Sequence, residues 1–322
     1  MKIVVTHSSP DMDAITSVWL IKKFLAGWEN AVVQFVPAGE RLGRGPVAGL
    51  PPANAPSASS VRVVGSPSSR ATPPDPIEMI NEHEVIHVDT GLGPLDHHQT
   101  ASDEVCGASL TFDFVKENIK DAKLEAVERM VRVIVDIDHF KEVFRKDPLS
   151  DYHEFDLAAI LDGLKLEFPG QDELYVVEVS KCLDAVLHGF ENRIWAEKEI
   201  KENGIKFETR FGKGIGFETI NDSVVKLAQK MGYAIAVRKD PRKGYVRVKA
   251  RPSLGIQNSE SRIQNRDTDL TLAYEKLRKM DPQATWYLHI SKKMLLNGSV
   301  KNPKMRPTKL TLDEIIKVLE KI

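Results

Sequence analysis

Short apolar runs alternate with segments of helical apolar spacing along the first part of the chain. The run KIVVTH at 2–7 is rich in β-branched residues, and the segment 13–27 that follows it has the apolar spacing of a helix. Apolar runs at 31–39 and 84–91 predict two more strands. Strands that alternate with helices predict an α/β fold, with a parallel sheet, helices on both of its faces, and ligand sites at the carboxyl ends of its strands.

The pattern changes in the second half of the chain. Helical spacing dominates up to residue 204, in the segments 108–119, 123–144, 156–164 and 172–204. Shorter strands and helices follow, with paired strands at 205–220, a helix at 223–232, a hairpin at 233–250, a helix at 269–280, a strand at 284–291 and a helix at 311–322. We therefore expect a first domain at 1–190, a helical linker at 191–202 and a smaller α+β domain at 203–322.

Residues 41–80 interrupt this pattern between the second and third predicted strands. The segment holds eight of the 18 prolines, four arginines and no lysine, although lysine is frequent elsewhere. Because such a segment cannot bury enough apolar surface to order itself, we expect a flexible insertion. Its composition also fits an out-of-frame stretch of the coding sequence. Within it, VRVV at 61–64 has the composition of an isolated strand.

Charge is balanced over the whole chain but divided unevenly along it. The formal net charge is −1, whereas residues 201–322 contain 26 lysines and arginines against 13 aspartates and glutamates. An acidic first part suits metal cations, and a basic second part suits a polyanion such as a nucleotide or nucleic acid. Solvated surface charge that is distributed unevenly by chance is the alternative explanation.

The sequence disfavours proteins held by disulfides or thiolate zinc sites, and proteins that span a membrane or carry a signal segment. Cys106 and Cys182 are the two cysteines, and their spacing fits neither a disulfide framework nor a thiolate zinc site. No apolar run reaches the length of a membrane span, and no signal-like segment opens the chain. We therefore expect a cytoplasmic protein without a membrane partner.

The turn after the first predicted strand, THSSPDMDA, concentrates side chains that bind metals. It places His7, Asp11 and Asp13 between a strand and a helix. A helix N-cap needs one acidic side chain, and Asp11 or Asp13 would serve that purpose. Two carboxylates and an imidazole also form a mixed N/O ligand set of the kind that Mn²⁺ accepts. Taken alone, the turn is explained by capping or by metal binding.

A second group of such side chains follows in EVIHVDTGLGPLDHHQT. Asp89 ends the third predicted strand, and Asp96, His97 and His98 come after a glycine-containing turn. In this order, HSSPDMDA, a strand-end aspartate and DHH resemble the DHH phosphoesterase superfamily, which includes RecJ-type exonucleases, oligoribonucleases, cyclic-dinucleotide phosphodiesterases and type II inorganic pyrophosphatases. The resemblance covers the chain to about residue 140. It implies a parallel-sheet domain that binds two Mn²⁺ ions, with Mg²⁺ or Co²⁺ as alternatives, and a smaller substrate-binding domain.

Matched by motif position, the resemblance also implies which residues bind the metal ions. His7 and Asp11 would bind one ion, and Asp13 and His97 would bind the other. Asp89 would bridge the two ions. Two-metal sites of this kind activate a water molecule for attack on phosphorus.

Further roles implied by the resemblance concern the neighbours of these ligands. His98 would face the transferred phosphate or act as a general acid, and Asp96 would orient a histidine ring. A last ligand is expected in VIVDIDHF, where Asp136 and Asp138 lie on different sides of a helix. The sequence IDHF is similar to the acidic motif of Myg-type 3′-to-5′ exoribonucleases, which favours Asp138. The adjacent His139 also fits an ordinary surface or core histidine.

The second domain lacks the glycine-rich GGGH-like loop of many phosphodiesterases in this superfamily. Instead, WYLHISKKMLLNGSVKNPKM offers hydroxyl, amide and lysine donors for a phosphate, or forms a solvated basic loop. Tyr245, Arg247, Lys249 and Arg251 share one face of a predicted strand, which suits a nucleic-acid backbone or the wet side of a hairpin. The predicted substrate-binding residues are Arg251, His289, Ser291, Asn297, Gly298 and Lys301.

Together these features lead to one expected function and two alternatives. We expect a metal-dependent hydrolase that cleaves phosphodiester or terminal phosphate bonds in nucleotides or short single-stranded RNA or DNA, as an exonuclease does. A small-phosphate hydrolase such as an inorganic pyrophosphatase is the first alternative. A catalytically inactive RNA-binding protein of the same superfamily is the second.

Overall fold

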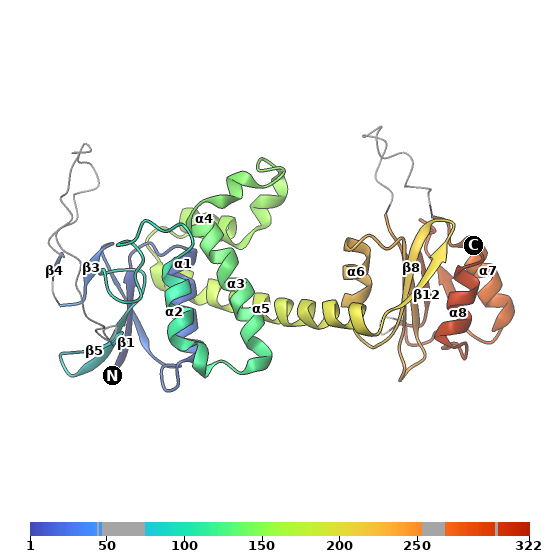
Figure 1. The fold of residues 1–322 in the computed structure, drawn as a ribbon, viewed down its shortest axis with the longest axis horizontal. Coiled ribbons are helices and arrows are strands. Elements are labelled where there is room, and N and C mark those ends of the chain that lie inside the picture. Colours follow the sequence, from blue (N-terminus) through green and yellow to red (C-terminus); the bar gives the residue numbers. More distant parts are fainter. Residues whose placement is uncertain (44, 47–74, 253–267, 300–301) are drawn as a thin grey trace. The chain divides into compact units, whose positions relative to one another are not determined.

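The computed structural model describes residues 1–43, 45–46, 75–252, 268–299 and 302–322 (Figure 1). It has a mixed α/β architecture, and its chain divides into two compact units, Met1–Glu191 and Asn192–Ile322. The division falls within helix α5, Asp172–Glu202. The predictions for 61–64, for Lys301 and for most of the expected insertion lie outside the described residues.

The first unit is built on a four-stranded sheet with the order β2-β1-β6-β5. Strand β1 pairs in parallel with β2 and β6, whereas β5 pairs antiparallel with β6. The strands are β1 Lys2–His7, β2 Val32–Val36, β5 Ile77–Ile80 and β6 His83–His87. The three predicted strands are thus confirmed. The prediction of a flexible segment over 41–80 was wrong for residues 77–80, because these residues form β5 and pair with β6.

The two faces of this sheet are covered differently. Helix α1, Met12–Phe24, packs against β1 and also contacts α2 and α3. The cluster of Ile3, Val5 and Val85 packs instead against Leu42 and apolar residues of the neighbouring strands. Leu42 lies between the short paired strands β3 Glu40–Arg41 and β4 Gly45–Pro46. Within the described residues, this face therefore carries a hairpin where the sequence predicted helices.

Helices follow the sheet in the first unit, and one of them ends earlier than predicted. A single helix was expected over 123–144, but α3 ends at Asp138 and Phe140 adopts a left-handed φ of 52°. The chain continues in two 3₁₀ turns before the next helix. The helical elements are α2 Gly107–Val115, η1 Lys116–Asn118, α3 Asp121–Asp138, η2 Lys141–Phe144, η3 Asp151–Phe155 and α4 Leu157–Glu167.

The second unit contains a six-stranded sheet with the order β11-β12-β10-β9-β8-β7. Its neighbours pair antiparallel except β8 and β9, which are parallel. The strands are β7 Ile205–Thr209, β8 Gly212–Glu218, β9 Ile235–Lys239, β10 Val246–Ala250, β11 Trp286–Leu288 and β12 Met294–Asn297. The helices are α6 Ser223–Lys230, α7 Thr271–Met280 and α8 Leu312–Leu319.

Two apolar clusters cover the two faces of this sheet. One joins strand residues such as Val237 and Val248 to α7 and α8, and the other joins Ile215 and Phe217 to α6. Residues 191–202, expected as a linker, form the last part of α5 and contribute Ala196 and Ile200 to the second cluster. Among the described helices, none combines the length and the apolar character that crossing a membrane requires.

Candidate metal centre

The candidate site lies where β1 and β6 end. β1 ends at His7, and Asp89 comes two residues after the end of β6. Because these strands are parallel neighbours, their carboxyl ends meet at one edge of the sheet. Val88 N donates to Val5 O at 2.9 Å, so the pairing continues almost to Asp89. Asp89 itself has a φ of 52°, a backbone conformation that is rare outside glycine and is often found at functional sites.

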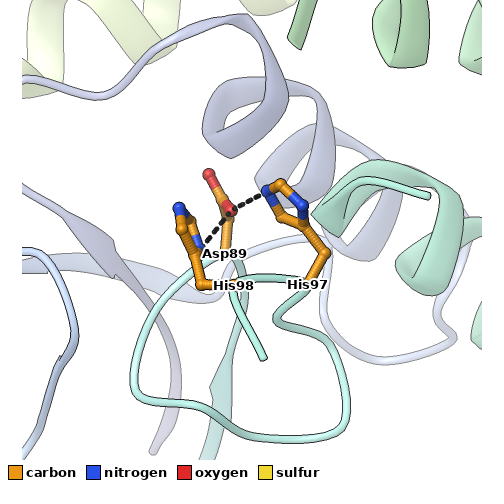
Figure 2. Close-up of side chains that lie close together, drawn as sticks. All are labelled: Asp89, His97 and His98. Atoms are coloured by element: carbon orange, nitrogen blue, oxygen red, sulfur yellow. Dashed lines mark ion pairs between the residues drawn. The ribbon is translucent and has the colours of Figure 1, made fainter. Parts of the chain in front are cut away.

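Asp89 occupies the centre of the site, and Figure 2 shows the rings of His97 and His98 on either side of it. The Oδ1 atom of Asp89 is 3.5 Å from His97 Nε2 and 3.7 Å from His98 Nδ1. Its Oδ2 atom is 3.3 Å from His7 Nε2. Within the described part of the chain, Oδ1 is buried without a hydrogen-bond partner. Leaving a buried carboxylate oxygen unpaired is costly, and a bound cation would offset that cost.

Three overlapping groups of side chains have the spacing of metal ligands. In each group, one ligand atom per residue lies within 4.8 Å of the others. The groups are His7, Asp11 and Asp89; Asp89, His97 and His98; and His97, Asp138 and His139. The distance from His97 Nε2 to Asp138 Oδ2 is 3.5 Å, and that from His7 Nε2 to Asp11 Oδ2 is 3.9 Å. Shared members join the three groups into one site.

Asp11 takes part in both of the arrangements that the sequence left open. Its Oδ1 atom accepts a hydrogen bond from Ala14 N at 2.9 Å and so caps α1. Its Oδ2 atom faces His7. Capping and a place among the ligand-type side chains are therefore compatible for this residue.

Asp13 is held at the N-terminus of α2. Its two oxygens accept hydrogen bonds from the backbone N–H groups of Gly107 and Ala108, each at 2.6 Å. Its Oδ2 atom also lies 3.7 Å from His97 Nε2. A Cβ atom at Gly107 would lie 2.9 Å from Asp13 Oδ2 and from Asp89 Cβ, so this position requires glycine. Sequence reasoning gave Gly107 and Ala108 no role.

Backbone carbonyls fix the orientation of two histidine rings. His7 Nδ1 lies 3.0 Å from the carbonyl oxygen of Ser8, which can only accept, so Nδ1 donates and Nε2 points toward Asp89. His139 Nε2 likewise donates to Val105 O at 2.9 Å. This nitrogen is also 3.6 Å from Asp138 Oδ2. His139, which the sequence explained equally well as a surface or core residue, therefore lies inside the cluster.

Asp96 forms hydrogen bonds with His98 and with the backbone of the turn that precedes it. Its oxygens accept hydrogen bonds from His98 Nδ1 at 2.7 Å, from His98 N at 3.0 Å and from Leu92 N at 2.7 Å. Burial opposes ionisation of Asp96, but these hydrogen bonds outweigh it and lower its pKa. The bond to Asp96 is also the main reason why the pKa of His98 is raised to about 9. The imidazole of His98 is therefore positively charged near neutral pH.

The environment of Asp13, Asp89 and Asp138 opposes their ionisation. Burial, followed by repulsion from Asp89, raises the pKa of Asp13 well above its usual value. Burial is also the main cause of the raised pKa of Asp89 and of Asp138. For His7, burial would lower the pKa, but its contacts with Asp89, Ser8 and Asp11 outweigh burial and raise it. Carboxylates gathered in this way form an electrostatic environment that favours a divalent cation.

Arg41 supports the turn between Asp89 and Asp96, although the sequence assigned it to a flexible insertion. Its Nη1 atom donates to Gly91 O at 3.0 Å, and its guanidinium also pairs with Glu78 of β5. A Cβ atom at Gly91 would lie 2.6 Å from Arg41 Cγ, and one at Gly93 would lie 3.0 Å from Arg41 Nη1. The two glycines therefore allow Arg41 to pack closely under this turn.

Several predicted substrate contacts lie at the turn between β11 and β12. His289 Nδ1 and Ser291 Oγ are 2.8 Å apart and hydrogen-bonded; Ser291 is exposed and His289 is partly buried. Arg251 is exposed at the same end of the sheet, since the preceding residue, Ala250, donates its N–H to Lys293 O at 2.8 Å. These three side chains are available to a ligand.

Asn297 and Gly298 differ from the prediction. Asn297 is fully buried, donates both amide protons to the carbonyls of Thr285 and Arg306, and accepts from Thr308 N. Gly298 has a φ of 76°, and the ring of Tyr245 occupies the space of a Cβ atom there. Asn297 is the last residue of β12 and Gly298 follows it, so three strand residues, at about 3.4 Å each, lie between Asn297 and the turn. The two residues therefore do not join His289 and Ser291 in one phosphate cradle.

The basic strand face is only partly open. Arg247 forms an ion pair with Asp222, and Arg238 Nε approaches the same carboxylate at 2.6 Å. Lys249 is partly buried, and burial together with the nearby charge of Arg247 lowers its pKa. Arg247 is therefore engaged within the unit, and the face is less available to a polyanion than its alternating pattern indicated.

Comparisons with known proteins give no family assignment. No protein-family model matches the chain, and no curated protein matches it. A solved structure, described as an uncharacterized protein from Helicobacter pylori G27, aligns over 99% of both chains with 12% identity and a TM-score of 0.23.

Proposed function

We propose that the protein is a Mn²⁺-dependent phosphoesterase of the DHH superfamily that acts on nucleotides or short single-stranded nucleic acid. The observation that carries this proposal is the gathering of aspartates and histidines around Asp89 at one edge of the first sheet. The mixed N/O donor set suits Mn²⁺. The unpaired buried oxygen of Asp89 and the raised pKa values of Asp13 and Asp138 provide independent support, since a divalent cation relieves both.

Two sets of side chains would hold the metal ions. His7, Asp11 and Asp89 would form one set, and Asp13, Asp89, His97 and Asp138 would form the other. When bound, such a pair of ions supplies a hydroxide nucleophile and neutralises charge on the phosphate. Nδ1 of His7 is engaged by Ser8 O, which leaves Nε2 for the metal. The amides at the start of α2 fix the orientation of Asp13.

His98 would act on the phosphate itself. Its side chain is 55% exposed, whereas that of Asp89 is 2% exposed, so His98 lies on the accessible side of the cluster. In the metal-free chain the hydrogen bond to Asp96 raises the pKa of the ring, and it fixes the Nδ1 atom. In its protonated form the ring is suited to donate a hydrogen bond to a phosphate oxygen or a proton to a leaving alkoxide. Asp96 is then a positioning residue that acts through His98.

The charge of the second unit favours a nucleotide or nucleic acid over inorganic pyrophosphate. Residues 201–322 hold 26 basic side chains against 13 acidic ones. Arg251 and Ser291, which are exposed, and His289, which is partly buried, offer donors at one end of the second sheet. A larger polyanion gains more from such an extended basic surface than a small one does.

Activity measurements with matched variants test the proposal. The full chain, stripped of metal and supplied with Mn²⁺, should hydrolyse bis-p-nitrophenyl phosphate and shorten single-stranded RNA oligomers. Asp138→Asn should lower the rate by at least about 100-fold, because second-sphere changes alone cost about 10–100-fold. Asp136→Asn is the matched control, since Asp136 lies on the same helix but is exposed and pairs with Lys141. It should retain the rate of the wild type.

The substrate panel separates the proposal from its alternatives. Mn²⁺-dependent turnover of RNA or DNA oligomers, of dinucleotides or of adenosine 3′,5′-bisphosphate (pAp) supports the proposal. Turnover of pyrophosphate alone would assign the site to a small-phosphate hydrolase. Retention of RNA at low salt without turnover of any substrate would assign the chain to the binding class, and equal loss of activity in both aspartate variants would contradict the assigned ligand set.

A further inference from the structure

The segment between α3 and α5 carries a group of large apolar side chains that are exposed. Phe144, Leu149, Tyr152, Phe155 and Leu166 are each between 83% and 93% exposed. Single exposed apolar residues are common, but a group of this size within one short segment is typical of an interaction site. We refer to these five side chains as the 144–166 surface.

A hollow opens beside the 144–166 surface. It is a cavity of about 600 Å³ whose lining includes Ile134 of α3, Leu157 of α4 and Leu183 of α5. Leu149 also belongs to the lining, and Val143 and Arg145, on either side of Phe144, line it as well. The cavity therefore adjoins the segment that carries the exposed apolar side chains, and Leu149 belongs to both.

Polar contacts hold this segment in its conformation. Arg145 Nη1 pairs with Asp156 Oδ2 at 2.5 Å, which joins the end of η2 to the start of α4. His153 Nε2 donates to Asp147 O at 2.7 Å and fixes the loop between η2 and η3. The apolar side chains are thus carried by a backbone that is already folded. Binding on this surface would cost little additional ordering.

The area of the surface matches the requirement of a stable dimer. Aromatic side chains such as Phe and Tyr bury about 150–250 Å² each, so the three aromatic residues of the set offer about 450–750 Å². The two exposed leucines add to that area. A standard protein interface buries about 800 Å² on each partner. Most homo-oligomers are two-fold dimers, in which the same patch of both copies must be self-complementary. A patch with protruding side chains beside a hollow meets that condition.

We propose that the 144–166 surface is the interface of a homodimer, in which apolar side chains of one copy enter the cavity of the other. The proposal does not depend on the phosphoesterase function, since it rests on residues outside the metal cluster. α4 is nevertheless linked to the site turn, because Lys165 Nζ donates to Ser9 O at 3.2 Å. Association is therefore measured without metal or substrate.

Sedimentation equilibrium of the full metal-free chain tests this proposal. The wild type should have twice the mass of the 36.0 kDa chain at micromolar concentration. Phe144→Glu and Phe155→Glu should each raise the dissociation constant by at least about 100-fold, because each change occurs twice in a symmetric dimer. Ile290→Glu is the matched control, since Ile290 is 91% exposed but lies in the second unit. It should dimerise like the wild type.

A measurement on the unmodified chain guards against misfolded variants. Hydrogen exchange of residues 140–168 should slow as the wild-type concentration rises through the dissociation constant. A wild type that stays monomeric up to about 100 µM overturns the proposal. Glu variants that fold and dimerise as tightly as the control would also overturn it. A wild-type monomer that binds phosphatidylcholine vesicles through this surface would overturn it as well.

Discussion

Replacing Asp96 by asparagine should lower the pKa of His98 in the metal-free protein. The hydrogen bond from His98 Nδ1 to Asp96 Oδ1, 2.7 Å long, is the main reason why the pKa of His98 rises from 6.5 to about 9. At pH 8, about 90% of the His98 rings carry a proton at a pKa of 9, against about 3% at a pKa of 6.5. The amide oxygen of the new side chain can still accept from Leu92 N, but its amide nitrogen cannot accept from His98 N or Nδ1. The change therefore removes the negative charge and both hydrogen bonds from His98.

The assay is an NMR titration of the imidazole Cε1–H signals in the EDTA-treated full chain. The signal of His98 is assigned by its loss in His98→Gln, and Asp113→Asn serves as a control, because Asp113 pairs with Lys116 outside the cluster. The raised pKa also predicts stabilisation that is complete below pH 6.5 and disappears as the pH rises toward 9. A wild-type His98 that titrates near pH 6.5, or an unchanged value in Asp96→Asn, would refute the reasoning.

Three further substitutions test other close contacts in the structure. Gly107→Ala should weaken Mn²⁺ binding by about 10-fold or more in calorimetry, because the new methyl group displaces Asp13 and Asp89. Gly163→Ala is the control: its methyl group meets open space, so Mn²⁺ binding should be unchanged. Gly298→Ala should lower the free energy of unfolding by about 1–3 kcal/mol in urea titrations, because its Cβ atom collides with the ring of Tyr245. Asn297→Ala should lower the free energy of unfolding by at least about 2 kcal/mol in the same assay, because it leaves buried backbone groups without hydrogen-bond partners. It should leave RNA affinity unchanged, and weaker RNA binding by a folded variant would show that Asn297 is a substrate contact.

The sequence was sufficient to locate the edge of the sheet where the site lies. KIVVTH and EVIHVDTG are recognisable as buried strands, and parallel neighbouring strands bring their carboxyl ends together. His7 and Asp89 could therefore be expected to approach one another without knowledge of the rest of the chain. The position of Asp138 was accessible only through a motif resemblance, because it depends on where α3 ends.

Contacts between distant segments were not accessible from the sequence. Gly107 N meets Asp13 across 94 positions in the chain, and Arg41 meets Gly91 across 50 positions. No periodicity encodes such pairs, because each depends on how separate elements pack. Arg41 was also hidden by the composition of the segment that follows it, which resembles a disordered insertion.

The error at Asn297 has a different cause. The residues Met294–Asn297 form a strand of four residues, too short for a clear alternating pattern between the two lysines that precede it and the glycine that follows it. An asparagine before a glycine was therefore interpreted as part of a polar loop. In the structure, its amide satisfies three backbone groups inside the second unit, a role that only the tertiary structure reveals.

Calorimetric titration of the metal-stripped chain with Mn²⁺ tests the central claim most directly. The account predicts that about two ions bind per chain and that Asp89→Asn removes both binding events, because Asp89 lies between the two sets of ligands. Asp136→Asn should bind like the wild type. A wild-type chain that takes up no Mn²⁺, or an Asp89→Asn chain that binds as many ions as tightly, would contradict it.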